Sequence, residues 1–392
     1  MWAIAVEMTA LQSARSVIMS CPPLFGLAMK NQDWLTLAHA YVNVSELHAL
    51  NARFGDTEVL VRQNERQLLD AGLSEQKAKA VSSPDQGAIE SALSWLDNDT
   101  HHIVHYGSDE YPDMLTQQSG APLMLFVNGN VGALHLPALA IIGSRNPTRG
   151  GVRNAVDFSR YLAKSGYTIV SGLAQGIDTA AHRGALDVKG RTIAFLGHGI
   201  DRVYPAQNYD LAHQIAADGA LVSEYPLGAA PDKRHFPERN RLISGLTLGT
   251  LVIEAARRSG SLITARLAAE QGREVFALPG SIHNPLARGC HQLIRQGAKL
   301  VETAADIGAE LAPLAGHLQQ NVMESTDSKP QPPDADDDYA ELRKVLSHDP
   351  TSIDELGVQS GLTIDQLSSM LLILELHGEI EALSGGRYAL IA

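Results

Sequence analysis

The chain is poor in cysteine: its 392 residues contain only Cys21 and Cys290. Two cysteines this far apart provide neither a disulfide framework nor a zinc site, and their scarcity favours a reducing compartment. No stretch approaches the roughly 18 consecutive apolar residues that a membrane-spanning helix needs. We therefore expect a cytoplasmic protein that holds no metal and does not enter the membrane.

The chain is also short of positive charge, since 31 Lys and Arg residues face 44 Asp and Glu residues. A net charge of −13 argues against nucleic-acid binding by the surface as a whole. The charge is unevenly spread, however. Residues 138–310 hold 20 basic and 15 acidic side chains, whereas residues 319–392 hold 4 and 14. The basic middle segment is compatible with a local anion site, with chance scatter on an ordinary domain as the alternative interpretation.

Common nucleotide and metal motifs are missing as well. The sequence has no G-x-x-x-x-G-K-[ST] and no Gly-Lys pair, which argues against a P-loop NTPase. The dinucleotide-binding motif G-x-G-x-x-G begins at Gly197-His-Gly199, but Arg202 stands in place of its third glycine. His101, His102 and His105 have no acidic residue or cysteine nearby at ligand spacing, so we interpret them as an ordinary surface cluster. We expect no cofactor.

The two ends of the chain predict separate modules. Residues 1–30 lack a basic region and contain Glu7, so we interpret them as a disordered or over-long start. Residues 31–100 show apolar residues at helical spacing with short loops, which predicts a small all-α module. Its expected role is packing or protein contact, with nucleic-acid binding as the alternative.

Beyond the middle segment, residues 319–338 are polar, acidic and contain proline, which is typical of a linker. Residues 339–392 predict three helices and a hairpin with a Gly-Gly turn, an arrangement that resembles a winged helix. Ser352 with Glu355 and Thr363 with Gln366 fit capping boxes. Because the third helix carries no Lys or Arg, we expect this module to contact protein or regulate, and not to enter a DNA groove.

Residues 101–312 alternate between strands and helices. After strand-like ends near 101–129, seven apolar segments predict strands: ALAII, YTIV, TIAFL, ALVSE, TLVIEA, EVFAL and AKLV. Helices are predicted between them, near 151–163, 178–186, 208–217, 238–246, 261–271 and 289–295. This alternation is typical of an α/β fold with a doubly wound parallel sheet.

The turns that follow these strands hold nearly all the unusual residues: GSRNPTRGG, SGLAQGID, GHGIDRVYPAQN, SEYPLGAAPDKRHFPERN, RRSGS and PGSIHNPLARG. Ligands bind at the carboxyl ends of strands in such sheets, so we expect these turns to form one crevice. Lys233, Arg234, Phe236, Arg239 and Arg241 combine positive charge with an aromatic ring, which suits a phosphodiester strand with exposed bases. The turn 259–261, Ser-Gly-Ser, opens a helix and is expected to offer N–H groups to an anion.

Two groups of residues leave catalysis open. Asp178 and His182 lie four residues apart and could form an acid/base pair, or Asp178 could cap its helix while His182 packs below the crevice. Glu254 could serve a hydrolase, or be a buried, hydrogen-bonded carboxylate near Arg241. Since no nucleophile and base are paired in the sequence, we expect no enzyme.

Five long motifs occur in a fixed order: GSRNPT, SGLAQGIDTAAH, TIAFLGHGIDRVYPAQN, SEYPLG…FPERNRLISGLT and VIEAARRSGSLITARLAAEQGREVFALPG. Together they resemble the DNA-processing protein A family (DprA, also called Smf). Larger members also carry a sterile-alpha-motif-like N-terminal module and a winged-helix-like C-terminal module. The resemblance implies that residues 101–312 form an extended Rossmann domain that dimerises and binds single-stranded DNA. It further implies protection of that DNA and loading of the RecA recombinase during natural transformation, without catalysis.

The family's DNA pocket falls on Gly143, Ser144, Arg145, Lys233, Phe236, Arg239, Asn240, Arg241, Ser259, Gly260, Ser261 and Thr264. By residue type, Arg145 and Lys233 are expected to bind phosphates and Phe236 to stack on a base. Arg239 and Arg241 have an alternative role as partners of Glu224 or Glu254. Gly289-Cys290-His291 departs from the family pattern, which is usually Gly-x-Asn.

The rival hypothesis is a Rossmann-type nucleotide-hydrolysing enzyme, similar to phosphoribohydrolases. Those enzymes carry P-G-G-x-G-T-x-x-E at the turn that reads RRSGSLITA here, and that motif is missing. The sequence therefore favours a single-stranded DNA-binding protein.

Overall fold

The computed structural model describes residues 30–55, 57–118 and 120–325, and toward the C-terminus residues 342, 345–347, 351–362, 367, 370, 371, 374, 380–383 and 387–390. The chain forms two compact units, Met1–Asn321 and Val322–Ala392. Apart from Lys30, the predicted start at 1–30 lies outside the described residues. Within them, every helix is too short or too polar to cross a lipid bilayer.

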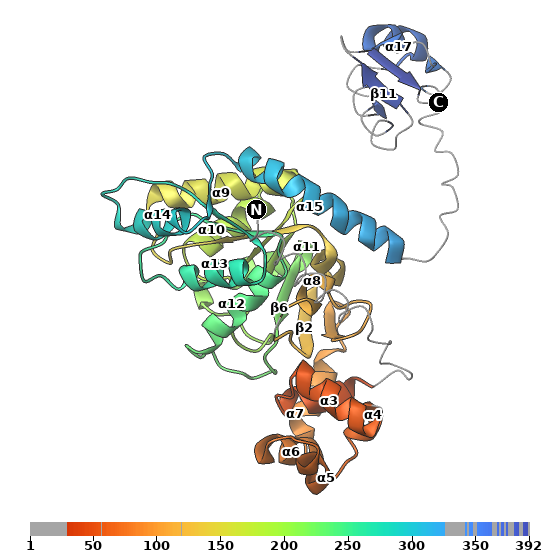
Figure 1. Cartoon of the computed structure of the whole chain (residues 1–392), viewed down its shortest axis with the longest axis vertical. Coiled ribbons are helices and arrows are strands. Elements are labelled where there is room, and N and C mark those ends of the chain that lie inside the picture. The colour runs from red at the N-terminus through yellow and green to blue at the C-terminus, as the bar shows by residue number, and fades with distance from the viewer. Residues whose placement is uncertain are drawn as a thin grey trace, which may run out of the picture. The chain divides into compact units, whose positions relative to one another are not determined.

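The predicted N-terminal helices are confirmed (Figure 1): α2 (Asn31–His39), α3 (Val44–Phe54), α4 (Thr57–Leu60), α5 (Glu65–Asp70), α6 (Glu75–Ser82) and α7 (Gln86–Trp95). Asn43 and Asn64 are the N-cap residues of α3 and α5. Each accepts the backbone N–H of the third helical residue, Glu46 or Gln67, whose side chain accepts the N–H of the cap in return. Because of the cap at Asn64, residues 57–72 form two short helices.

Two of the three clustered histidines pack against tryptophans. His105 stacks on Trp34, with ring centroids 4.4 Å apart, and His101 stacks on Trp95 at 4.0 Å. The Nδ1 atom of His101 also lies 2.7 Å from the carbonyl oxygen of Trp95. The interpretation as an ordinary surface cluster is therefore wrong for these two, because their rings fasten the helical module to the first strand.

The sheet has nine strands: β1 (His101–His105), β2 (Met124–Gly129), β3 (Ala138–Ile142), β4 (Thr168–Ser171), β5 (Thr192–Phe195), β6 (Ala220–Ser223), β7 (Gly249–Val252), β8 (Glu274–Ala277) and β9 (Lys299–Leu300). Their order is β1-β2-β6-β5-β4-β3-β7-β8-β9. The seven strands from β3 to β9 pair in parallel, which confirms the predicted sheet, whereas β1 and β2 add an antiparallel edge next to β6.

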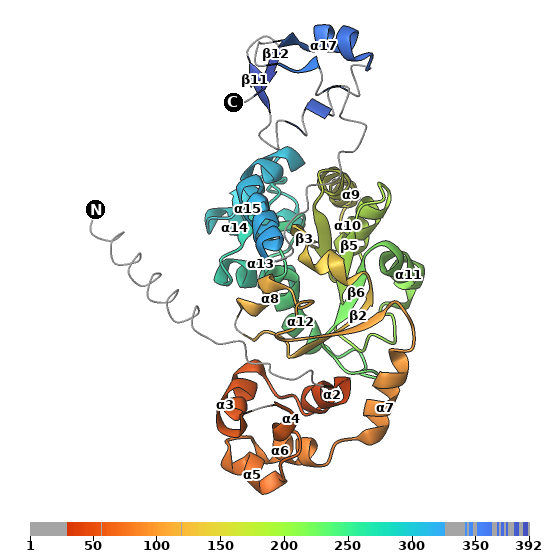
Figure 2. The ribbon, with the colours of Figure 1, turned by 90° about the vertical axis from the view of Figure 1, so that its right-hand side faces the viewer.

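Helices follow the strands: α8 (Asp113–Thr116), η1 (Val131–His135), α9 (Arg149–Lys164), α10 (Ile177–Leu186), η2 (Ala206–Asn208), α11 (Tyr209–Asp218), α12 (His235–Gly245), α13 (Ser261–Glu270), η3 (Pro285–Ala287), α14 (Arg288–Arg295) and α15 (Ala304–Ser325). Figure 2 shows α9 and α10 on one side of the strands and α13 and α14 on the other. Strand β3 serves both layers: Leu139 and Ile141 pack with α9 and α10, whereas Ala140 and Ile142 pack with α12, α13 and α14.

The strand order reverses between β3 and β7. From β3 the chain continues to β4 on one side, while β7 and β8 lie on the other. Loops that leave two such strands diverge to opposite faces and leave a crevice between them, which is where open α/β sheets bind ligands. The fold therefore places the turns after β3 and β7 on either side of one crevice.

The last helix of the first unit differs from the prediction. The composition predicts a linker from residue 319, but α15 runs to Ser325 and contains Pro313. The first residues of the predicted linker, 319–325, therefore belong to this helix. The rest of the segment 319–338 lies outside the described residues.

The C-terminal unit contains a three-stranded sheet in the order β10-β12-β11, built from β10 (Thr351–Ser352), β11 (Ile380–Leu383) and β12 (Arg387–Leu390). The predicted capping box of Ser352 and Glu355 begins α17 (Ile353–Ser360), and the predicted hairpin pairs β11 with β12. Leu356, Leu367 and Leu371 share its buried core. The Thr363 and Gln366 capping box lies outside the described residues.

Candidate nucleic-acid interface

A pocket of about 630 Å3 occupies the crevice at the switch point between β3 and β7. Eleven of the twelve predicted site residues line it: Gly143, Ser144, Arg145, Lys233, Phe236, Arg239, Asn240, Ser259, Gly260, Ser261 and Thr264. They come from the turns after β3, β6 and β7 and from the helices α12 and α13. The twelfth residue, Arg241, lies elsewhere.

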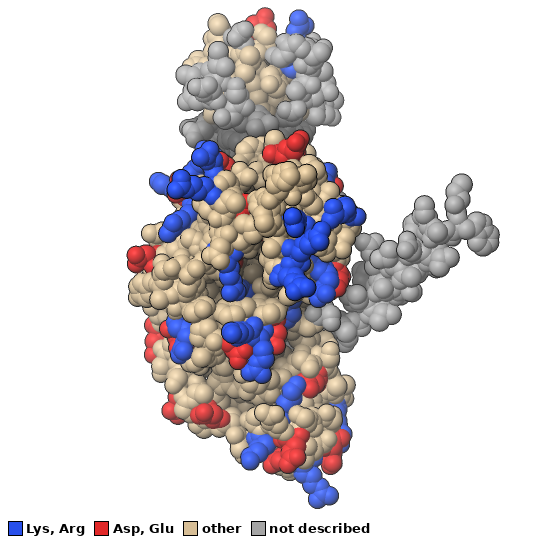
Figure 3. Space-filling model, turned by 90° about the vertical axis from the view of Figure 1, so that its left-hand side faces the viewer, with Lys and Arg blue, Asp and Glu red and all other residues tan. Residues whose placement is uncertain are grey.

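Three exposed cations surround the pocket: Arg145, Lys233 and Arg258. Within the described part of the chain none of them forms an ion pair, whereas their neighbour Arg234 pairs with Asp232 at 3.0 Å. Figure 3 shows Lys and Arg side chains gathered around a hollow on this face. Unpaired cations around a concave surface create a positive potential that attracts a polyanion.

Arg239 belongs to the floor of the pocket and is only 4% exposed. Its Nη1 donates to the carbonyl oxygen of Gly172 at 2.9 Å and to that of Phe195. Burial lowers the pKa of this guanidinium to about 10, so it stays charged at neutral pH. Arg239 thus fixes the ends of β4 and β5 and adds positive charge from below, without an exposed guanidinium for a ligand.

Asp178 and His182 do not form the acid/base pair that their spacing allows. The Asp178 carboxylate accepts the backbone N–H groups of Gly172 and Ala174, at 3.1 and 3.4 Å, so it fixes the loop after β4 and does not cap α10. Burial raises its pKa, and the nearby Arg239 opposes this rise.

His182 is fully buried and lies 2.7 Å from the hydroxyl of Thr192. That hydroxyl donates to the Ile169 carbonyl oxygen, so Nδ1 of the imidazole carries the proton and donates to it. Burial lowers the pKa of His182 to about 3, which keeps the ring neutral. Its position under the sheet confirms the packing interpretation.

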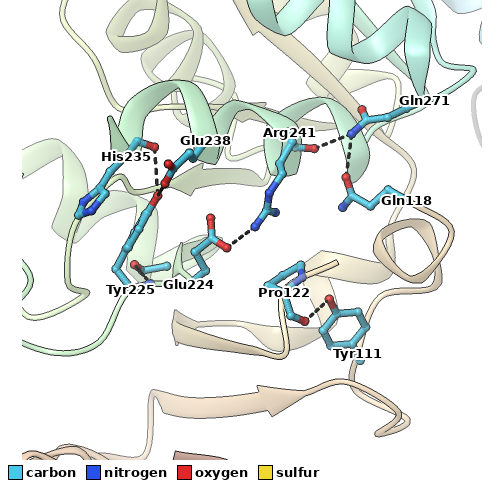
Figure 4. Close-up of polar contacts among 10 residues, drawn as sticks. Tyr111, Gln118, Pro122, Glu224, Tyr225, His235, Glu238, Arg241 and Gln271 are labelled. Carbon is cyan, nitrogen blue, oxygen red and sulfur yellow. Dashed lines mark hydrogen bonds and ion pairs between the residues drawn. The ribbon is translucent and has the colours of Figure 1, made fainter. Parts of the chain in front are cut away.

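Arg241 is the ion-pair residue that the sequence left undecided. Figure 4 shows it pointing to Glu224, with which it forms a partly buried salt bridge. The backbone carbonyl oxygen of Arg241 accepts from the side chain of Gln271, which also donates to Gln118. These contacts hold α12 against the neighbouring segments and orient its first turn toward the pocket.

Arg241 is paired with Glu224, and Glu254 has a different partner. Its carboxylate accepts the backbone N–H of Thr148 at 2.9 Å and the Thr148 hydroxyl at 2.6 Å. The same threonine caps α9, since its hydroxyl oxygen accepts the N–H of Gly151. A Cβ at Gly151 would come within 2.5 Å of the carboxylate, so a larger residue there would displace Glu254 from Thr148. Glu254 is thus a buried structural carboxylate, and it ties the two sides of the crevice together.

The turn at Ser259 offers fewer free donors than the sequence suggests. Ser261 N–H donates to the Ser259 hydroxyl oxygen at 3.3 Å, and the N–H groups of Leu262 and Ile263 bond to carbonyls of the same turn. Among the described N–H groups from Ser259 to Ile263, only that of Gly260 has no partner. The turn therefore presents one N–H group and two hydroxyls, and the two hydroxyls bond each other at 2.6 Å.

Phe236 lies in the first turn of α12 and points into the pocket among three neighbours. The guanidinium carbon of Arg145 is 5.6 Å from its ring centroid, within cation–π range. The Tyr204 ring centroid lies 5.9 Å away. Gly197 approaches so closely that a Cβ there would come within 2.9 Å of the Phe236 ring.

The sequence interpretation missed Arg258 and Tyr204, which both line the pocket. Arg258 directly precedes the recognised Ser259, and the next residue upstream is also basic, so charge alone could have suggested it. Tyr204 lies in the turn after β5, which was expected to border the crevice. No sequence pattern in this turn indicates that Tyr204, and not one of its neighbours, lines the pocket.

Comparison with known proteins gives consistent matches. The family described as DNA recombination-mediator protein A matches residues 102–312, and the DprA winged helix domain matches residues 326–386. Protein Smf of Escherichia coli is 42% identical over 320 residues, which cover 81% of this chain and 85% of that protein. DNA processing protein DprA of Streptococcus pneumoniae is 48% identical over 202 residues, which cover 52% of this chain and 71% of that protein. The crystal structure of DprA from Streptococcus pneumoniae covers 72% of this chain and 99% of the solved chain, with a TM-score of 0.64 and 36% identity.

Proposed function

The chain belongs to the DNA recombination-mediator protein A family, DprA or Smf, and on this premise we propose that it binds single-stranded DNA in the switch-point pocket. One observation carries the proposal. Three cations from three separate turns, none of which forms an ion pair within the described residues, surround a pocket that also contains aromatic rings. Cations that follow a backbone, combined with rings on which bases stack, are the features that bind unpaired polynucleotide.

The proposed contacts follow from exposure. Arg145, Lys233 and Arg258 bind phosphates, because their charges are exposed and have no ion-pair partner in the described part of the chain. The Gly260 N–H adds one donor to a phosphate oxygen. The rings of Phe236 and Tyr204 bring an aromatic surface to the pocket, and stacking on such a surface is worth roughly 1–3 kcal/mol per base. Asn240, Gly143 and Ser144 complete the wall, while Arg239, Thr264 and Arg241 position it from behind.

Single strands are favoured over duplexes because the aromatic surface lies inside the pocket. In a duplex the faces of the bases are already stacked on their neighbours, so a ring cannot reach them without paying the unstacking cost. An unpaired strand exposes its bases at no such cost. We therefore expect the protein to prefer single-stranded DNA at every salt concentration.

The wider functions rest on the family resemblance. We infer that the protein protects incoming single-stranded DNA, dimerises through residues 101–312 and loads RecA during natural transformation or homologous recombination. We propose that the chain consists of a start at 1–30, a helical module at 31–100, the Rossmann domain at 101–312, a linker at 319–338 and a winged-helix-like domain at 339–392. Filament assembly by RecA on DNA coated with single-strand-binding protein tests the loading step, and light scattering of the purified chain tests the dimer.

We infer that the protein does not act as an enzyme at this pocket. Asp178, His182 and Glu254, which are the groups suited to acid–base chemistry, are each engaged in structural hydrogen bonds. The test is fluorescence anisotropy with single- and double-stranded oligonucleotides of one sequence, alongside an assay for hydrolysis of mononucleotides. Preference for the single strand without hydrolysis supports the proposal, and hydrolysis without strand binding contradicts it.

A further inference from the structure

Tyr204 is an aromatic residue of the pocket that the fold does not need in its interior. It lies in the loop between β5 and α11 and lines the pocket beside Phe236. Its side chain is 49% exposed, although a tyrosine that serves only packing is usually buried on its apolar faces. Among the described residues, its hydroxyl has no hydrogen-bond partner. Neither burial in the core nor hydrogen bonding of the hydroxyl therefore explains why a tyrosine stands at this position.

The neighbours of Tyr204 hold its ring in a fixed place. On one side the ring contacts Phe236, with centroids 5.9 Å apart and planes inclined by 36°. His198, which is buried, meets it edge to face at 6.4 Å. Aromatic pairs at such separations are attractive and cost little conformational entropy, because each ring has only two side-chain torsions. The exposed face is thus presented in a fixed orientation.

The faces of Phe236 are largely occupied. The Arg145 guanidinium lies over the ring, the Gly197 backbone lies against it, and Tyr204 covers a further side. Arg145, Phe236 and Tyr204 thereby form a continuous series of a cation and two rings. In this series the outer face of Tyr204 is the aromatic surface that remains open to a ligand.

We propose that Tyr204 is the stacking platform for an unpaired nucleobase, with Phe236 as the ring that supports it. The inference rests on the proposed function, since the base belongs to the strand whose phosphates Arg145 and Lys233 bind. A base on the outer face of Tyr204 extends the series of rings by one. Because every base has such a face, the contact is independent of sequence.

The experiment compares two oligonucleotides of equal length, poly-deoxythymidine and an abasic polymer with the same phosphates. Tyr204→Ala is expected to weaken deoxythymidine binding by about 5- to 150-fold and to leave abasic binding unchanged. Tyr204→Phe keeps the ring and is expected to bind both as the original protein does. Tyr209→Ala is the matched control, because Tyr209 is 57% exposed on α11 but lies outside the pocket lining.

Each outcome decides between the ideas. If Tyr204→Ala weakens both oligonucleotides equally, the tyrosine shapes the pocket and does not stack, and the inference is overturned. Unchanged binding by Tyr204→Ala, or an equal loss in Tyr204→Phe, overturns it as well. If the original protein binds neither oligonucleotide, the proposed function itself fails. Near-ultraviolet circular dichroism of each variant verifies that the pocket remains folded.

Discussion

The Glu254 carboxylate at the end of β7 bonds both the backbone N–H and the hydroxyl of Thr148, at 2.9 and 2.6 Å, across 106 residues of sequence. This contact joins the two turns on either side of the switch point. One turn carries Arg145 and the other Arg258, so the distance between two proposed phosphate contacts depends on it.

Replacing Glu254 by Gln is expected to lower the free energy of unfolding by about 1–3 kcal/mol. Glutamine has an NH2 group in place of one of the two accepting carboxylate oxygens, so one of the partly buried Thr148 donors loses its acceptor, which costs about that much. Urea unfolding of the full chain measures the change. Glu270→Gln is the control, because Glu270 forms only an exposed pair with Arg266 and its loss should cost less than about 1 kcal/mol. Equal effects of the two variants would contradict this role for Glu254.

Arg145→Ala and Lys233→Ala are each expected to weaken DNA binding for every sequence and to flatten its salt dependence. Each phosphate contact contributes about −0.7 to the slope of log affinity against log salt for single strands, because a bound cation releases counterions. Arg234→Ala provides the control, since Arg234 is next to Lys233 but is paired with Asp232. Anisotropy titrations at several salt concentrations give the slopes. A slope that stays the same in Arg145→Ala or Lys233→Ala removes that residue from the set of phosphate contacts.

Arg241 and Glu224 are expected to couple to each other and not to DNA. Removing either charge leaves its partner partly buried and unpaired, so Arg241→Met and Glu224→Gln should each destabilise the fold by about 2–4 kcal/mol. The double variant should lose less than the sum of the two. A double-mutant cycle of unfolding free energies measures this coupling. Additive losses, or a flattened salt slope in Arg241→Met, would show that Arg241 acts on DNA after all.

His182 is expected to make the fold sensitive to mild acid. Its folded-state pKa, about 3, lies below the ordinary value of 6.5, so between these values the unfolded chain binds a proton that the folded chain does not. Stability contributed by the neutral ring is complete above about pH 6.5 and decreases as the pH falls toward 3, by up to roughly 1.4 kcal/mol per pH unit. His39, His105 and His198 are shifted in the same direction and add to the effect.

The measurement is the unfolding free energy of the original protein and of His182→Gln from pH 7.5 to 5.0. Glutamine can still donate to Thr192 but takes up no proton, so its stability should fall less steeply with acid. The three other histidines act alike in both proteins and cancel in the comparison. Parallel pH profiles would mean that His182 does not stay neutral in the folded chain.

The sheet and most of the pocket could be predicted because their signals are local. The parallel strands from β3 to β8 are short and mostly apolar, and the turns after β3, β6 and β7 carry the charged and polar residues that line the crevice. The sequence left two roles open for Arg239 and Arg241, DNA contact or ion pair, and could not decide between them because their partners are brought close only by the fold. Arg239 bonds carbonyls 67 and 44 residues away, and Arg241 pairs with Glu224 through the folded sheet.

The position of Tyr204 in the pocket could not be predicted from the sequence either. Its sequence neighbours Val203 and Pro205 are equally compatible with a loop, and only the packing against Phe236 turns this one ring into the pocket. Composition likewise gave no sign that helix α15 continues into the first residues of the predicted linker, as far as Ser325. A helix can continue into polar sequence because adding residues to an existing helix is easier than starting a new one.

The most direct test titrates the full chain with one oligonucleotide, presented single-stranded and as a duplex, over a range of salt concentrations. The account predicts tighter binding of the single strand throughout, with a slope close to −0.7 for each phosphate held by Arg145, Lys233 and Arg258, hence about −2 for the three. Equal or stronger binding of the duplex, or binding of the single strand that does not respond to salt, would contradict it.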